Sequence, residues 1–186
     1  MKDANAENQK EQIQPSAIYQ DFIRTLVSIV KNVTMKDLKS LDFNYRLINK
    51  YRREFFENDF IYLNNTFIKP KFDFTSFSKP TPEEVNFKFN PVTLERCQQN
   101  IEVYSFIFMI LLTKLIDYRD FKEALISVRS LISFFKTNES LTINTLKAKA
   151  YYYLSLITEK LNIQDQIINE LQEAYRTACI EMDSIS

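Results

Sequence analysis

The fold is decided by the stretch Ala148-Lys149-Ala150-Tyr151-Tyr152-Tyr153 and by an earlier one, Tyr118-Arg119-Asp120-Phe121-Lys122-Glu123-Ala124. Both stretches mix small residues with aromatic and aliphatic ones at helical spacing. Such residues let neighbouring helices pack closely, and neither stretch has the pattern of a reactive site. This part of the chain therefore predicts packed helices that hold partners rather than a catalytic centre.

Four helices are predicted after Pro91. They span about 93–116, 121–136, 141–161 and 163–182, and the first begins at Thr93 or Cys97. Asp120, with Glu123 three positions on, matches a capping box at the start of the second helix. Asn162 is expected to cap the fourth helix.

The two helix pairs resemble each other. Lys114-Leu115 followed by Phe121, Leu125 and Val128 matches Lys160-Leu161 followed by Ile167, Leu171 and Ala174 at the same spacing. The pattern indicates tetratricopeptide-like packing with a period longer than the usual ~34 residues. We therefore predict an all-α helical repeat, an α-solenoid.

The whole chain of 186 residues divides into four predicted parts. Residues 1–15 form a disordered polar tail, and 16–66 form N-terminal helices over about 16–33 and 36–56, with 59–67 either helical or extended. Residues 67–93 form a linker rich in Phe and Pro, and 94–186 form the helical-repeat segment, which is incomplete at its C-terminus.

The Phe/Pro-rich linker differs from the rest of the chain. Proline blocks regular helix, and the phenylalanines alternate with polar residues. This composition predicts an extended strap that covers the chain's own core, with the surface of a partner as the alternative. The residues concerned are Pro70, Pro80, Pro82, Pro91, Phe72, Phe74, Phe77, Phe87 and Phe89.

The composition excludes several classes of function. The chain has no glycine, no histidine and a formal net charge of zero. Phosphate-binding glycine loops, histidine triads and histidine metal sites are therefore ruled out, and nothing favours nucleic acid. Loops that need positive φ are expected to use Asn or Asp. We expect no cofactor, no metal and no small-molecule substrate.

Membrane insertion is not expected either. The most apolar run, from Val103 to Leu112, is about half the ~20 residues that cross a bilayer and predicts a buried helix. Cys97 and Cys179 lack metal spacing and are expected to be reduced thiols. The carboxylate pairs Glu102 with Asp117 and Glu170 with Glu173 are interpreted as solvated surface, so the chain is not expected to be an enzyme.

Residues 101–183 resemble the subunit 3 family of the non-ATPase regulatory subunits in the 26S proteasome lid. The resemblance begins with Glu102-Val103-Tyr104 and continues through the second stretch quoted above. Its specific elements are 148–153 and the closing Arg176-Thr177-Ala178.

This resemblance implies a non-catalytic scaffold of the regulatory particle, acting in ubiquitin-dependent degradation. It implies other lid subunits as partners and a location in cytoplasm and nucleus. The family carries a PCI domain after its helical repeats, whereas this chain stops at Ser186. We therefore expect an N-terminal portion, a sequence from a truncated gene model, or a divergent short form.

Two alternatives remain open at this stage. A tetratricopeptide-type adaptor would bind a peptide through Lys147, Lys149 and Arg176, and a related PCI complex of the signalosome or translation-initiation kind would share the design. The expected partner-binding residues are tyrosines, because Tyr is favoured at interfaces. They are Tyr152, as the outermost of its run, with Tyr151 and Tyr175.

Overall fold

The computed structural model describes residues 17–68, 87 and 89–183, with side chains described as far as Cys179. In these residues every regular element is helical, which confirms the all-α prediction. The helices are α1 (Ala17–Met35), α2 (Leu38–Arg46), α3 (Ile48–Glu54), α4 (Glu57–Phe67), α5 (Pro91–Gln98), α6 (Ile101–Asp117), α7 (Phe121–Thr137), α8 (Asn144–Lys160) and α9 (Ile168–Asp183), with short 3₁₀ turns η1 (Leu141–Ile143) and η2 (Gln164–Gln166).

The predicted tail at 1–15 and most of the predicted linker at 67–93 lie outside the described residues. Two linker phenylalanines are described. Phe87 is buried, with its ring centroid 4.7 Å from that of Tyr19 and 5.7 Å from that of Phe22 on α1. Phe89 stacks on Phe87 at 6.0 Å. At these two positions the linker covers the chain's own core.

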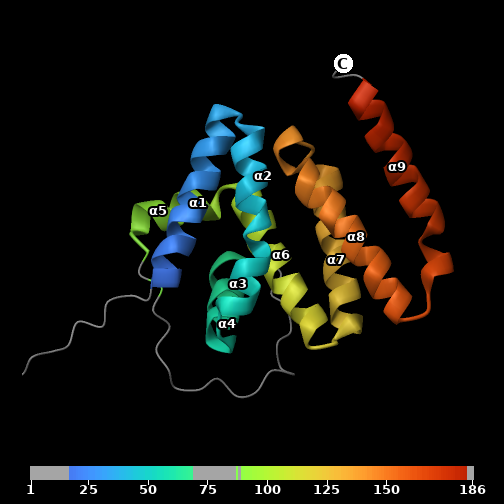
Figure 1. Cartoon of the computed structure of the whole chain (residues 1–186), viewed down its shortest axis with the longest axis horizontal. Coiled ribbons are helices and arrows are strands. Elements are labelled where there is room, and N and C mark those ends of the chain that lie inside the picture. The colour runs from blue at the N-terminus through green and yellow to red at the C-terminus, as the bar shows by residue number, and fades with distance from the viewer. Residues whose placement is uncertain (1–16, 69–86, 88, 184–186) are drawn as a thin grey trace, which may run out of the picture.

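Helix α6 is the centre of the fold (Figure 1). It packs against α1, α3 and α4 on one side and against α7 and α8 on the other. Its run from Val103 to Thr113 is buried except for the half-buried Tyr104, as the sequence predicted. Each large apolar side chain buried in this way stabilises the fold by roughly 1.5–3 kcal/mol. The same core extends through α1–α4 and α7–α8.

The helix expected from Thr93 or Cys97 to Ile116 is two helices instead. Helices α5 and α6 meet at 85°. The break occurs because Asn100 is extended and its side chain accepts a hydrogen bond from the Val103 amide at 2.9 Å, which starts a new helix. Asn90 caps α5 in the same way, with Pro91 in the first turn.

The stretch expected as one helix over about 36–56 is also divided, at Leu47, into α2 and α3. The region 59–67, which the sequence left open, is helical in α4. Its first turn is capped by Asp59, whose carboxylate accepts from the Phe56 amide at 2.9 Å.

Three helices end in the same kind of corner. Lys36, Arg119 and Asn162 have φ values of 55°, 61° and 56°, and each follows the last turn of α1, α6 or α8. After each, the next amide donates to a carbonyl five residues back, which is the Schellman pattern. The expectation of Asn or Asp at such positions is correct at Asn162 and wrong at Lys36 and Arg119.

The residue after the corner decides how soon the next helix begins. Asp37 caps α2 by accepting from the Ser40 amide. Asp120 caps α7 by accepting from the Glu123 amide, as predicted. Ile163 follows Asn162 and has no side-chain acceptor, so a 3₁₀ turn intervenes and α9 begins only at Ile168. Asn162 thus ends α8 and does not cap the fourth helix, contrary to the prediction.

Candidate partner-binding surface

The tyrosine run of α8 points in three directions because successive helical residues are about 100° apart. Tyr152 is exposed over 63% of its surface, while Tyr151 and Tyr153 are half-buried. Ala150 and Leu154 on either side are fully buried and fix the helix against α7. The run therefore anchors α8 and presents one ring, that of Tyr152, to the outside.

The two half-buried tyrosines have different neighbours. Tyr151 lines a groove between α8 and α9. Burial raises the pKa of its hydroxyl, and the nearby carboxylates of Glu170 and Glu173 raise it further. Tyr153 contacts the ring of Tyr152 edge-on at 5.3 Å. Burial raises the pKa of Tyr153 as well.

Tyr175 lies on α9 and is exposed over 73% of its surface. A hydrogen bond between its hydroxyl and Cys179 raises the pKa of Tyr175. The groove between α8 and α9 includes Tyr151 but neither Tyr152 nor Tyr175. The structure thus presents the three predicted residues as separate points on the α8–α9 end of the molecule and does not gather them into one pocket.

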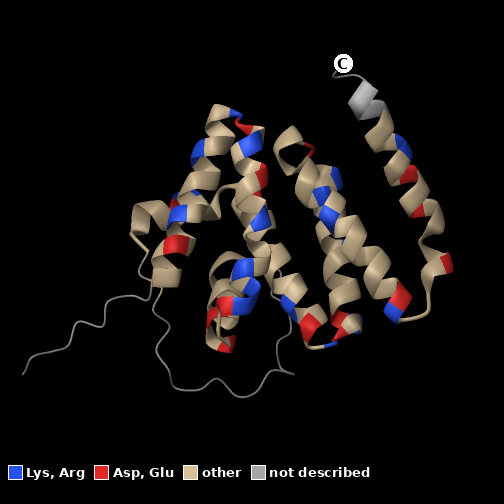
Figure 2. Ribbon diagram, in the orientation of Figure 1, with Lys and Arg blue, Asp and Glu red and all other residues tan. Residues whose placement is uncertain are grey.

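The groove between α8 and α9 has a volume of about 230 Å³ and a mixed charge. Lys136 and Lys147 face Glu139, Glu170 and Glu173 across it, and Lys136 lies 3.9 Å from Glu170. Cations and carboxylates of similar number give it no preference for an anion. Figure 2 shows the same interleaving of both signs along the helices.

The three cations expected of an adaptor do not converge. Lys147 lines the groove, but the ammonium group of Lys149 donates to the Tyr45 carbonyl at 2.9 Å, at the end of α2. Desolvation lowers the pKa of Lys149. Arg176 is exposed on α9 and lies outside the groove lining. Lys149 is a structural tie, so this trio does not form a peptide-carboxylate site.

The paired carboxylates also have structural neighbours. Glu102 accepts a hydrogen bond from the Thr142 hydroxyl, and Asp117 lies 2.8 Å from Arg52. These two residues stand at opposite ends of α6, about 22 Å apart at helical rise. Glu170 and Glu173 lie together in the α8–α9 groove. Among the described residues no cluster of three Cys, Asp or Glu side chains is placed to hold a metal ion.

The hydrogen bonds between the N-terminal helices and the repeat are not visible in the sequence pattern. The hydroxyl of Tyr45 on α2 donates to the Thr142 carbonyl at 3.0 Å, beside the bond from Lys149. At the other end Tyr118 donates to Glu57 at 2.5 Å, and burial raises the pKa of Tyr118 to about 12. These hydrogen bonds join residues that are far apart in sequence, so no local sequence pattern predicts them.

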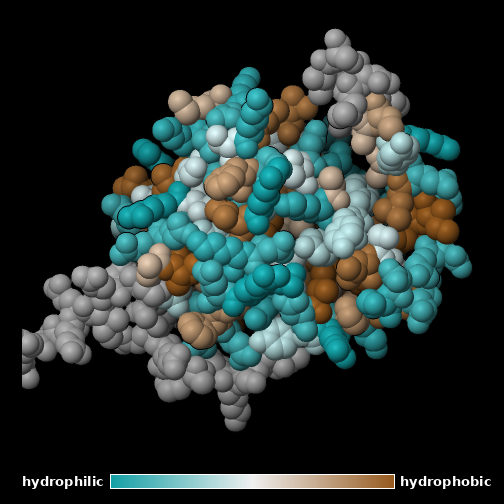
Figure 3. Space-filling view, viewed as in Figure 1, coloured by the Kyte–Doolittle hydropathy of each residue, from teal (hydrophilic) through white to brown (hydrophobic). Residues whose placement is uncertain are grey.

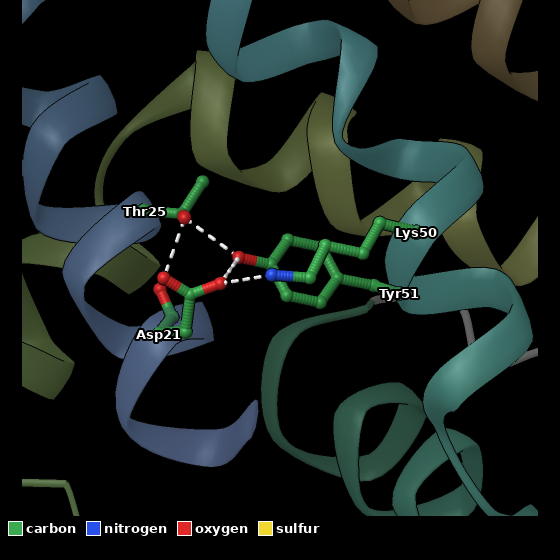
Figure 4. Close-up of polar contacts among 4 residues, drawn as sticks. All are labelled: Asp21, Thr25, Lys50 and Tyr51. Atoms are coloured by element: carbon green, nitrogen blue, oxygen red, sulfur yellow. Dashed lines mark hydrogen bonds and ion pairs between the residues drawn. The ribbon is translucent and has the colours of Figure 1, made fainter. Parts of the chain in front are cut away.

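A further polar cluster joins α1 to α3 (Figure 4). Lys50 lies 2.5 Å from Asp21, and the Tyr51 hydroxyl shares a hydrogen bond of 2.7 Å with Thr25 and donates to Asp21 at 3.3 Å. The hydrogen bond from Lys50 lowers the pKa of Asp21. This cluster therefore joins α1 to α3, in addition to the hydrogen bonds that join α2 and α4 to the repeat.

No single helix in the described part of the chain is long and apolar enough to span a bilayer. The bent pair α5 and α6 passes a test of length and composition when the two are taken together. Most of α6 is buried inside the protein, as expected for a core helix.

The fold and this surface define a class: a helical-repeat protein of the tetratricopeptide type with aromatic side chains exposed at one end. Comparison with known families agrees. The family described as "PSMD3-like, N-terminal TPR repeats" matches residues 3–186, so the chain belongs to this family.

Two relatives give the family its context. The chain is similar to "Probable 26S proteasome non-ATPase regulatory subunit 3" of Drosophila melanogaster, with 34% identity over 44% of this chain and 17% of the relative. It is also similar to "26S proteasome non-ATPase regulatory subunit 3" of Dictyostelium discoideum, with 32% identity over 44% of this chain and 16% of the relative. The matched stretch is therefore less than a fifth of each relative's length. No solved structure is significantly similar to the chain.

Proposed function

We propose that this chain is a non-catalytic scaffold of the proteasome regulatory particle, placed in its lid, and that it acts in ubiquitin-dependent protein degradation. Membership of the PSMD3-like family over residues 3–186 carries the proposal. The two relatives named as non-ATPase regulatory subunits of the 26S proteasome support it.

The mechanism proposed is rigid spacing of partners. Hydrogen bonds link Tyr45 on α2 to Thr142 and Lys149, and Tyr118 to Glu57 on α4, and they hold the N-terminal helices against the repeat. A well-packed group of helices of this kind undergoes no large internal motion, so two partners bound at its opposite ends stay at a fixed distance from each other. Other lid subunits are the proposed partners, and neither nucleic acid nor membrane is among them.

The contact surface proposed is the α8–α9 end. Tyr152 and Tyr175 are exposed there, together with Ile168, which is exposed over 46% of its surface. Exposed aromatic and aliphatic side chains gain most from burial in a protein interface. We propose that the chain works in cytoplasm and nucleus, which microscopy of a fluorescent fusion would test.

Affinity purification of the tagged chain from its native cells, followed by mass spectrometry, tests the function. We expect subunits of the proteasome regulatory particle to copurify. Tyr152→Ala combined with Tyr175→Ala should lower their recovery severalfold. The matched control is Phe43→Ala on α2, which removes an aromatic ring exposed to a similar degree, 65%, away from this end.

Two results would contradict the proposal. One is a folded chain that recovers a single abundant client and no regulatory-particle subunit, which would favour the peptide-binding adaptor. The other is equal recovery with the tyrosine variant and the Phe43→Ala control, which would exclude the α8–α9 end as the contact surface.

A further inference from the structure

A second surface, a groove between α1 and α5, takes no part in the contacts described so far. It has a volume of about 360 Å³ and lies where α5 crosses α1. Val27, Val30 and Met35 line it from α1, and Cys97 lines it from α5. Volumes of this size are typical of binding sites in proteins.

The groove is apolar and open to solvent. Val27 is exposed over 45% of its surface and Met35 over 66%, and Val92 at the start of α5 is exposed over 59%. Figure 3 shows hydrophobic surface where α5 lies beside α1. Neighbouring apolar side chains that remain exposed together mark interaction sites.

The floor of the groove is preformed. Cys97 is buried, and burial raises the pKa of its thiol to about 11, so the group stays neutral. Asn90 and Pro91 fix the start of α5, and α5 packs directly on α1. A partner would therefore meet a surface that is already shaped, and little free energy would be lost in ordering it.

Both charged residues that line the groove are cations. Lys31 and Arg96 are exposed, and within the described residues neither forms an ion pair. The carboxylates nearest along the chain, those of Asp37 and Glu95, are not among the lining residues. The charged side chains that line the groove are therefore both positive.

From this geometry we propose that the α1–α5 groove binds an acidic amphipathic helix of another protein. The lining residues of α1 recur at helical spacing from Val27 to Met35, so they form one straight edge about 12 Å long. A partner helix of about two turns can lie along it, with its apolar face on Val27 and Met35. Its carboxylates then pair with Lys31 and Arg96.

The proposal is independent of a role in the proteasome, because it rests on residues of α1 and α5 alone. Selection from a displayed library of random helix-forming peptides, with the full chain as bait, supplies the probes. We expect the recovered peptides to be rich in Asp and Glu beside Leu, Ile or Phe. Binding should weaken about tenfold in Lys31→Glu combined with Arg96→Glu, through loss of two charge contacts.

The matched control makes the same charge change on α7, where Lys122→Glu combined with Arg129→Glu alters two exposed cations away from the groove. This variant should bind within about twofold of the parent chain, because charges so far from the groove are screened. A methyl-labelled methionine spectrum gives a second readout. The Met35 signal should shift on peptide binding, and that of Met109, buried in α6, should not.

Several results overturn the proposal. The selection could recover no peptide, or it could recover peptides rich in Lys and Arg. The combined Lys31→Glu and Arg96→Glu variant could also bind the peptides as tightly as the parent chain. A Met35 signal that shifts with protein concentration alone would assign the groove to a second copy of this chain. A shift on replacing Phe72, Phe74 and Phe77, without peptide, would assign it to the chain's own linker.

Discussion

At the scale of single residues, the absence of glycine concentrates backbone strain at a few corners. Lys36 and Arg119 adopt φ values of 55° and 61°, where a side chain with a β-carbon is disfavoured by roughly 1–2 kcal/mol. The hydrogen bonds of the Schellman corner impose this conformation on whichever residue follows the helix. The composition predicted that residues other than glycine would occupy these positions. It did not show which residues, because the corner imposes its conformation on any residue that follows the helix.

Arg119→Gly should therefore stabilise the protein. Relief of the left-handed strain exceeds the extra chain entropy of glycine, and we expect a gain of about 1 kcal/mol, or roughly 2–4 °C in Tm. Thermal unfolding followed by circular dichroism measures this. The control, Arg129→Gly inside α7, removes the same side chain from an exposed helical position and should lower stability by about 1 kcal/mol. Equal effects of the two variants would contradict the argument.

A second prediction concerns the buried carboxyl of Asp59. Desolvation raises its pKa, although the Phe56 amide and the Tyr19 hydroxyl both donate to it. A group with a raised folded pKa contributes stability that is lost as pH rises through that pKa. Asp59→Asn keeps an acceptor for both donors and removes the titration. In urea unfolding, the free energy of unfolding of this variant should rise relative to that of the parent protein as pH rises from about 4 to 7.

The opposite sign is expected at Asp37, which serves as the control. Hydrogen bonds from Ser40 lower the pKa of Asp37, so its contribution is present above the unfolded pKa and lost as pH falls. The free energy of unfolding of Asp37→Asn should thus fall relative to that of the parent protein as pH rises through the acid range. If both variants changed in the same direction, the two environments would not explain the pH dependence.

At the scale of elements, the sequence predicted helix content well and helix ends poorly. The apolar run of α6 and the Asp120 cap of α7 are local signals, and both are confirmed. The break at Asn100 was missed because asparagine is compatible with a helix interior and with a cap. The packing of α5 on α1, with α5 at 85° to α6, favours the cap over a continuous helix.

Asn100→Ala tests this element boundary. The variant loses the acceptor for the Val103 amide at the start of α6, and we expect stability to fall by about 1 kcal/mol. Chemical denaturation measures the loss. Asn49→Ala, at an exposed position within α3, serves as control and should change stability by less than about 0.5 kcal/mol. An equally small effect at Asn100 would show that tertiary packing alone sets the break.

At the scale of the whole molecule, the candidate surface could be predicted only in part. That Tyr152 would be the outermost ring of its run follows from helical geometry, and it is the exposed one. The ties of Lys149 to Tyr45 and of Tyr118 to Glu57 span long sequence separations, and only the fold brings these partners together. The same holds for the α1–α5 groove, whose cations come from two helices separated by most of the N-terminal half.

The last prediction concerns α9, at the end of the array (Figure 1). Ile167, just before it, is buried, but from Ile168 to Cys179 every side chain is half-buried or exposed, and the ion pair from Lys136 to Glu170 is long at 3.9 Å. Few buried contacts mean a low free energy of local opening. In the isolated chain we therefore expect α9 amides to exchange with deuterium at least about tenfold faster than those of α6. Partner binding at the α8–α9 end should slow exchange in α9 and leave α6 unchanged, whereas equal protection of both helices in the isolated chain would show that α9 already has its full packing.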